Sequence, residues 1–201
     1  MGRIARLASF IVMSDHAHPS TLLRRRFLRG AAGFAGVLLA PVGRICAQSL
    51  PARTLSFVHT HTGESLRAAY FSDGIYQPGG LARVDRLLRD FRSGEIRAID
   101  PRLLDILYRL QILADRPATY EVISGYRSPQ TNAALHRASG GVAEHSLHME
   151  GRAIDVRMTG FSTRRLRDLA LALRSGGVGY YARSDFVHLD TGRPRSWGDK
   201  T

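Results

Sequence analysis

Apolar residues recur along this chain with two different periods, and the period separates predicted strands from predicted helices. Residues 54–61 and 65–71 are strand-like runs on either side of Thr62-Gly63-Glu64, a pattern that predicts a β-hairpin with a glycine turn. From 81 to 92 the apolar residues are instead three or four positions apart, which predicts a helix with one buried face.

The middle of the chain predicts the main core helix and a central strand. Asp100-Pro101 places a capping side chain before a proline, a strong start for a helix that ends near Arg116-Pro117. Residues 120–124 then form a short run typical of a strand. Ser128-Pro129 begins a second, shorter helix over 129–138.

The remaining pattern predicts three strands and one helix. We expect strands over 153–158, 178–181 and 186–190, with a helix that begins at Ser162 or Thr163 and continues to Arg174. Helices grouped apart from a late pair of strands favour a single α+β domain with a mostly antiparallel sheet and flanking helices over a doubly wound fold.

The net charge indicates possible partners only when the N-terminal segment is counted separately. The net charge is +12, but residues 1–47 carry seven arginines and one acid, so residues 48–201 are at +6. That modest excess is compatible with an anionic polymer such as cell wall. It lacks the basic and aromatic platform that single-stranded nucleic acids require, so we expect no nucleic-acid partner.

Residues 1–47 resemble an export signal. Arg24-Arg25-Arg26-Phe27-Leu28-Arg29 matches the twin-arginine form, and the apolar run 30–42 is too short to span a bilayer. Cleavage after Ala47 would release residues 48–201 into the periplasm or beyond, without Cys46 and with no membrane span. Three alternatives remain: a buried or anchoring helix instead of a signal, a lipoprotein signal at Cys46, and a true start at Met13.

Three side chains are candidates for a metal site. His148 precedes the 153–158 strand, Asp155 points to one face of it, and His188 lies in the last strand. If these strands are neighbours, two imidazoles and a carboxylate converge as zinc ligands and leave a fourth position for water.

Simpler explanations exist for each of these residues. A lone histidine beside a strand is more often a core or surface residue, and a strand aspartate more often pairs with an arginine. His145 is a rival ligand to His148. His59 and His61 share one face of the first strand but lack a carboxylate partner, so we interpret them as a solvated face, and we expect His136 to be structural.

Family motifs favour the zinc interpretation. The pattern Ser-x-His-x-x-Gly-x-Ala-x-Asp over 146–155, the upstream run 124–128 and the later Val187-His188 resemble the LAS group of zinc peptidases. That group includes D-Ala-D-Ala carboxypeptidases, murein endopeptidases and the hedgehog signalling domain. The runs 177–181 and 188–192 are most similar to its small exported murein endopeptidase branch, and the resemblance covers roughly 54–197.

The resemblance implies a fold, an activity and two further site residues. It implies one zinc per chain, held by His148, Asp155 and His188, in a hedgehog-like domain that hydrolyses peptidoglycan peptides, and we expect a monomer. Arg127 would stabilise the polarised carbonyl, and the alternative is that it forms a salt bridge with a nearby acid. The family's glutamate base is replaced by Asp185, three residues before His188, with Asp190 as its rival on grounds of strand parity. A carboxypeptidase and a non-catalytic, zinc-containing wall-binding domain are the alternatives.

Overall fold

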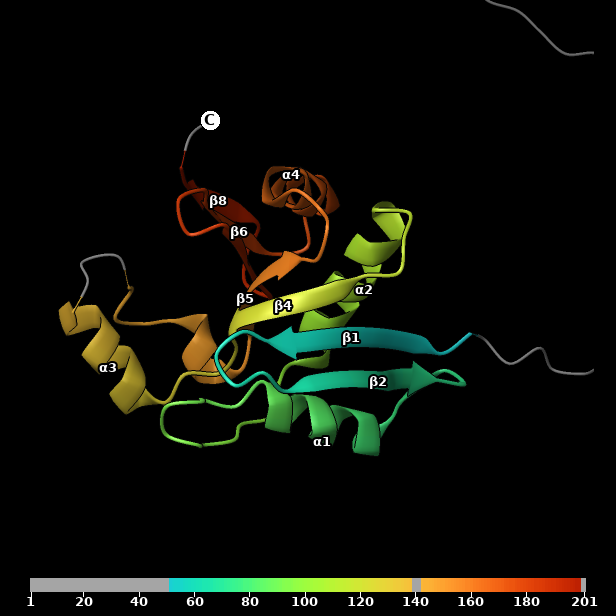
Figure 1. The fold of residues 1–201 in the computed structure, drawn as a ribbon, viewed down its shortest axis with the longest axis horizontal. Helices are drawn as coiled ribbons and strands as arrows, with labels where there is room; N and C mark the ends of the chain where they lie inside the picture. The colour runs from blue at the N-terminus through green and yellow to red at the C-terminus, as the bar shows by residue number, and fades with distance from the viewer. Residues whose placement is uncertain (1–50, 139–141, 200–201) are drawn as a thin grey trace, which may run out of the picture. The chain divides into compact units, whose positions relative to one another are not determined.

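The computed structural model describes residues 51–138 and 142–199, and the proposed export signal lies outside them (Figure 1). Its elements follow in the order β1 (Arg53–His59), β2 (Ser65–Ser72), β3 (Ile75–Tyr76), α1 (Pro78–Leu87), α2 (Pro101–Leu113), β4 (Thr119–Ser124), α3 (Pro129–Ala138), the 3-10 turn η1 (Leu147–Glu150), β5 (Ala153–Met158), α4 (Thr163–Leu173), β6 (Gly177–Tyr181), β7 (Phe186–Asp190) and β8 (Arg195–Gly198).

All eight strands of the described residues form one mixed sheet in the order β3-β2-β1-β4-β5-β7-β6-β8. Five of its pairings are antiparallel, and two, β1 with β4 and β6 with β8, are parallel. The predicted α+β domain with a mostly antiparallel sheet is therefore confirmed.

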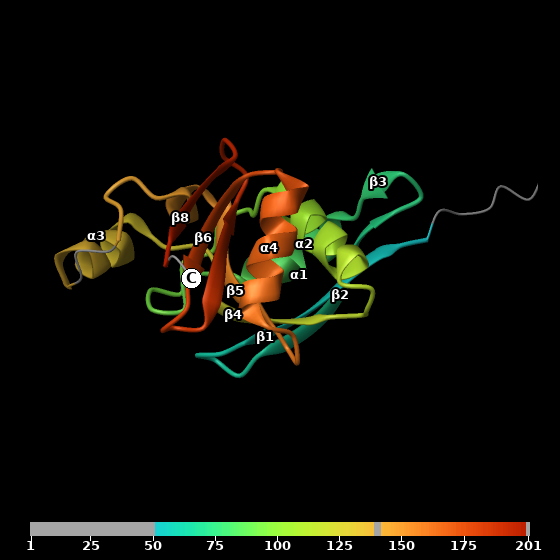
Figure 2. The same cartoon turned by 90° about the horizontal axis from the view of Figure 1, so that it is seen from above.

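Helices α1, α2 and α4 pack with the sheet into one hydrophobic core, and α3 lies apart at one end (Figures 1 and 2). Alternation along β1 buries Leu55 and Phe57 on the helical side, while Ser56 and Val58 remain partly exposed on the opposite side. The same alternation lets a strand of this sheet present a polar side chain on the face away from the core.

Helix α2 is the main core helix, as its sequence predicts. Asp100 accepts a hydrogen bond from the Arg102 N–H, and Pro101 occupies the first turn. Its buried side chains are Leu103, Leu104, Ile106, Leu107 and Leu110. Hydroxyls of two strand tyrosines reach its backbone, because Tyr70 donates to the Leu104 carbonyl and Tyr120 to the Leu107 carbonyl.

Helix α1 ends earlier than the apolar spacing predicts, at Leu87 rather than Arg92. The chain turns there, with the Asp90 N–H donating to the Glu95 carbonyl and the Gly94 N–H donating to the Asp90 carbonyl. This turn places the Asp90 carboxylate against the start of α3, where it accepts from the Ser128 N–H and hydroxyl. Among the described residues, no helix is both long and apolar enough to cross a membrane.

Candidate metal centre

His148 is held in place by the short turn η1. The Ser146 hydroxyl accepts from the His148 N–H, and Gly151 ends the turn in the left-handed conformation at φ 68°. A Cβ at Gly151 would lie 2.3 Å from the Ala98 carbonyl oxygen, so both the conformation and the space require glycine. The His148 side chain is 1% exposed.

Asp155 and His188 face each other on neighbouring antiparallel strands. They are register partners in the pairing of β5 with β7, so their side chains lie on the same face of the sheet. Ile154 and Val156 point the other way, into the core. The two strands are therefore neighbours, which is the condition on which the predicted metal site depends.

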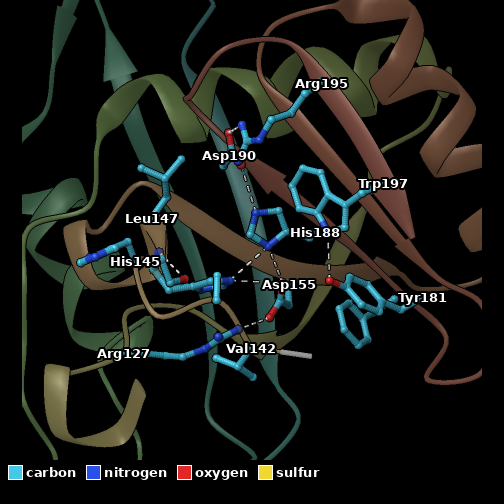
Figure 3. A pocket seen from close by; sticks show the side chains of 14 residues that line it. Arg127, Val142, His145, Leu147, Asp155, Tyr181, His188, Asp190, Arg195 and Trp197 are labelled. Carbon is cyan, nitrogen blue, oxygen red and sulfur yellow. Dashed lines mark hydrogen bonds and ion pairs between the residues drawn. The ribbon is translucent and has the colours of Figure 1, made fainter. Parts of the chain in front are cut away.

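The three side chains converge on one point (Figure 3). His148 Nε2 lies 3.3 Å from Asp155 Oδ1 and 3.1 Å from His188 Nδ1, and His188 Nδ1 lies 2.9 Å from Asp155 Oδ1. Two ligand atoms on a tetrahedral zinc with bonds of about 2.0–2.1 Å are themselves about 3.3 Å apart. The spacing of the three atoms fits that geometry.

Hydrogen bonds on the far side of each imidazole fix which nitrogen faces the cluster. His148 Nδ1 lies 2.6 Å from the Gly125 carbonyl oxygen, which can only accept, so Nδ1 carries the proton and Nε2 presents a lone pair. His188 Nε2 lies 3.2 Å from Asp190 Oδ2 and leaves Nδ1 toward the cluster. Three acceptor atoms around one point need a shared positive charge, and these residues fit a bound metal ion.

The electrostatics of the cluster follow from its burial and its charges. Burial alone would raise the pKa of Asp155, but the charge and hydrogen bonds of His148 and His188 outweigh it and hold that pKa well below its usual range. Burial lowers the pKa of His148. Burial alone would also lower the pKa of His188, but hydrogen bonds with Asp155 and Asp190 outweigh it and raise that pKa.

Arg127 lies directly beside the cluster. Its Nη2 donates to Asp155 Oδ2 at 2.6 Å, its Nε donates to the Ser124 hydroxyl at 2.9 Å, and its side chain is 12% exposed. Asp155 thus turns one oxygen to the histidines and the other to Arg127. Nη1 of Arg127 makes no hydrogen bond within the described part of the chain.

Asp190 lines the same pocket and contacts the far side of the His188 ring. Besides His188, it accepts from the Arg195 guanidinium at 2.7 and 3.1 Å and from the N–H groups of Gly177 and Gly192. Burial raises its pKa, but these hydrogen bonds outweigh burial and lower the pKa overall. Both oxygens of the Asp190 carboxylate therefore already accept hydrogen bonds.

Asp185 is not brought to the cluster. It lies in the turn between β6 and β7, 60% exposed, where it accepts from the Thr163 hydroxyl at 2.7 Å and approaches Arg157 at 3.6 Å. It does not line the pocket that holds the histidines. Its backbone has a φ of 51°, a left-handed conformation that aspartate tolerates better than most residues.

The other histidines have different places. His145 lines the same pocket but stands outside the three-residue cluster, and His136 Nδ1 lies 2.6 Å from the Val142 carbonyl oxygen. The prediction of a solvated face at His59 is wrong: it is fully buried, with its ring edge-on to Phe91 at 5.3 Å. Its partner His61 is exposed and stacks on the same ring.

A pocket of about 370 Å³ opens over the cluster. One wall is aromatic, formed by Tyr181, Phe186 and Trp197, and Figure 3 shows Trp197 and Tyr181 on the same side of His188. These side chains are not among the functional residues predicted from the sequence. The alternation of Gly177, Gly179 and Tyr181 along one face of β6 is a sequence signal that could have identified Tyr181.

The chain is similar to known peptidoglycan endopeptidases over most of its length. The family profile described as "Peptidoglycan L,D-endopeptidase MepK" matches residues 47–197. The protein of that name from Escherichia coli strain K12 is 43% identical over 175 residues, which cover 86% of this chain and 96% of the relative. The "Probable peptidoglycan L,D-endopeptidase MepK" of Haemophilus influenzae is 39% identical over 176 residues, covering 87% and 95%. No solved structure matches the chain significantly.

Proposed function

The chain belongs to the peptidoglycan L,D-endopeptidase family, within the LAS group of peptidases, and on that premise we propose that it is a zinc-dependent enzyme that hydrolyses bonds between L and D centres in peptidoglycan peptides. The observation that carries the proposal is the convergence of His148 Nε2, Asp155 Oδ1 and His188 Nδ1 at 2.9–3.3 Å from one another, beside Arg127 and inside a pocket.

We propose His148, Asp155 and His188 as the ligands of one zinc ion per chain. When bound, zinc supplies a water whose pKa is lowered toward about 7 and polarises the carbonyl that is attacked. The protein's part is to hold three ligand atoms in fixed orientations, which the Gly125 carbonyl and the Asp190 carboxylate do for the two imidazoles.

Arg127 is proposed to stabilise negative charge on the substrate. Its guanidinium is anchored by Ser124 and Asp155 through Nε and Nη2, so Nη1 remains to donate toward a substrate oxygen in the pocket. Because the same arginine contacts a proposed ligand, Arg127→Ala is expected to weaken metal binding as well as slow hydrolysis.

Asp185 is retained as the proposed general base, which accepts the proton of the attacking water and returns it to the leaving amine. Asp190, its rival, has every oxygen occupied by His188, Arg195 and two backbone N–H groups. To act, the Asp185 side chain must leave Thr163 and turn toward the pocket. Phe186, the next residue, already lines that pocket.

The test of the ligands is digestion of cross-linked peptidoglycan peptides, with zinc content measured on the same samples. We expect wild type to release fragments, to lose activity with a chelator and to regain it with added zinc. His148→Ala, Asp155→Ala and His188→Ala should each lose most zinc and activity, while His136→Ala, a histidine outside the cluster, should keep both. Full zinc in two of the three ligand variants would refute the ligand assignment.

The test of the base uses Asp185→Asn, with Asp168→Asn on the exposed face of α4 as the matched control. Asp185→Asn should keep zinc and lose on the order of 10²-fold or more in rate, and the control should lose nothing. If Asp185→Asn is fully active, the base is another group and the enzyme proposal stands. If zinc-loaded wild type binds peptidoglycan but releases no fragment, a non-catalytic binding domain is the better explanation.

We also propose that residues 1–47 route the protein through the twin-arginine machinery and that a monomeric domain of residues 48–201 acts in the periplasm or beyond. The support is the Arg24-Arg25 pair ahead of a short apolar run. Twin-arginine export carries folded proteins, which suits an enzyme that takes up its metal before export.

A further inference from the structure

Tyr181 stands on the same face of the sheet as the metal ligands. Gly179 is the register partner of His188 in the pairing of β6 with β7, and Tyr181 lies two residues further along the same face of β6. Its ring stacks on Phe186 with centroids 4.6 Å apart and planes at 20°. Packing from Phe186 therefore fixes the plane of the phenol at the edge of the pocket.

Trp197 reaches Tyr181 across Gly179. The two residues Gly179 and Trp197 are register partners in the pairing of β6 with β8, and a Cβ at position 179 would lie 2.8 Å from Trp197 Cε2 and 2.9 Å from its Nε1. The missing side chain thus provides the space in which the indole lies. The indole centroid is 5.1 Å from that of His188, so this wall directly adjoins the proposed metal ligands.

The hydrogen bond between the two rings has only one possible direction. Trp197 Nε1 lies 3.0 Å from the Tyr181 hydroxyl oxygen, and an indole nitrogen can donate but not accept. The Tyr181 oxygen is therefore the acceptor, and its own proton must go elsewhere. Within the described residues no protein group accepts that proton, and Tyr181 lines the pocket (Figure 3).

We propose that Tyr181 is a further catalytic residue, whose O–H donates to the substrate oxygen that gains negative charge when water attacks the peptide carbonyl. Trp197 is then a positioning residue, because its N–H occupies the phenol oxygen and directs the phenol proton into the pocket. In Figure 3, Tyr181 and Arg127 lie on either side of Asp155, so two donors would approach the reacting centre from different directions. This inference rests on the proposed function.

The decisive variant is Tyr181→Phe, which keeps the stacked ring and removes only the hydroxyl. We expect kcat for cross-linked peptide fragments to fall on the order of 10²-fold, as for loss of one donor to a developing oxyanion, with KM, zinc content and melting temperature unchanged. The matched control is Tyr180→Phe, which removes a hydroxyl one residue away on the core side and should leave kcat unchanged.

A double-mutant cycle tests the role of Trp197. Trp197→Phe removes the indole N–H and should lower kcat severalfold when Tyr181 is present. In the Tyr181→Phe background the same change should have no further effect on kcat, because no phenol proton remains to be directed. Equal effects in both backgrounds would contradict the positioning role.

The outcomes separate this inference from the proposed function. If wild type hydrolyses the fragments in a zinc-dependent way and Tyr181→Phe retains full kcat, the catalytic role of Tyr181 is wrong and the proposed function stands. A rise in KM at constant kcat would likewise overturn it, since the hydroxyl would then bind substrate and transition state equally. Absence of hydrolysis by zinc-loaded wild type would refute the proposed function itself.

Discussion

Asp90 is a buried carboxylate that ties the turn after α1 to the start of α3, next to Arg127. One oxygen accepts from the Ser128 N–H at 2.9 Å and hydroxyl at 2.8 Å, and the other accepts from the Arg92 N–H. Burial raises the pKa of Asp90, but hydrogen bonds from Thr131, Ser128 and Arg92 outweigh it and lower the pKa to about 2.

The pH dependence of stability should report this carboxylate. Since its folded pKa lies below the usual 3.8, its contribution is fully present above that value and is lost as the pH falls through about 2. Asp90→Asn is therefore expected to lower the free energy of unfolding at pH 7 by about 2 kcal/mol. Urea unfolding at several pH values should show the gap between wild type and variant closing as the pH falls from about 4 to about 2, and a constant gap would contradict the assignment.

At the scale of single residues, the sequence predicted which side chains share a face of the sheet better than it predicted what each side chain contacts. With β5 and β7 as neighbours, strand parity and motif spacing were enough to indicate that Asp155 and His188 share one face. They could not reveal that His59 is buried against Phe91, because that contact depends on where the turn after α1 folds back. For Asp185, parity was uncertain because a turn precedes the strand, and the hydroxyl of Thr163 decides where its carboxylate lies.

At the scale of elements, α1 approaches β2 unusually closely. A Cβ at Gly80 would lie 2.0 Å from the Ala69 carbonyl oxygen and 3.1 Å from the Tyr70 Cα, whereas nothing lies within 4 Å of one at Gly79. Of these two adjacent glycines in the first turn of the helix, Gly80 leaves no room for a side chain, whereas Gly79 does.

Gly79→Ala and Gly80→Ala form a matched pair. Alanine favours helix over glycine by up to about 1 kcal/mol, so Gly79→Ala should leave stability unchanged or raise it slightly. Gly80→Ala should lower it by more than that gain, because β2 backbone must shift. Chemical unfolding of both variants measures the difference, and a stabilised Gly80→Ala protein would show that the helix can move away from β2 at little cost.

Most elements follow from their sequence pattern, and the exceptions share a cause. Strands β3 and β8 have two and four residues, all exposed, and neither shows an apolar alternation. Pairing with β2 and β6 alone makes them strands, so no local signal predicts them. Because β8 was not predicted, the contribution of Trp197 to one wall of the pocket was not predicted either.

At the scale of the whole molecule, the proposed metal would act as a cross-link. Its three ligands come from η1, β5 and β7, so a metal bound by all three exists only when these elements are assembled. Free metal at about 100 times its dissociation constant would add about 2.7 kcal/mol to the stability of the folded state.

Chelation should therefore lower the melting temperature of wild type by roughly 5–10 °C, and added zinc should restore it. His188→Ala should melt at the same temperature with and without chelator. Identical melting curves of wild type in both conditions would show that no metal is bound through the fold. Calorimetry or circular dichroism is sufficient for the measurement.

Export concerns residues outside the described part of the chain. Changing Arg24 and Arg25 together to lysine should leave the protein in the cytoplasm with residues 1–47 attached, since the twin-arginine pathway reads the pair. Arg26→Lys, at the variable position of the motif, is the control and should be exported normally. Fractionation and intact mass measure both outcomes, and normal export of the double variant would refute this route.

The mixed sheet also has a consequence for the order in which the chain folds. Strands β6 and β7 are joined by residues 182–185 alone, whereas residues 60–118 separate β1 from its parallel partner β4. Closing the longer loop costs about 2 kcal/mol more in chain entropy. In pulsed hydrogen exchange we expect amides of the β6–β7 pair to become protected before those between β1 and β4. The β6–β7 pair, which carries His188, would thus be structured before the β1–β2 hairpin pairs with β4.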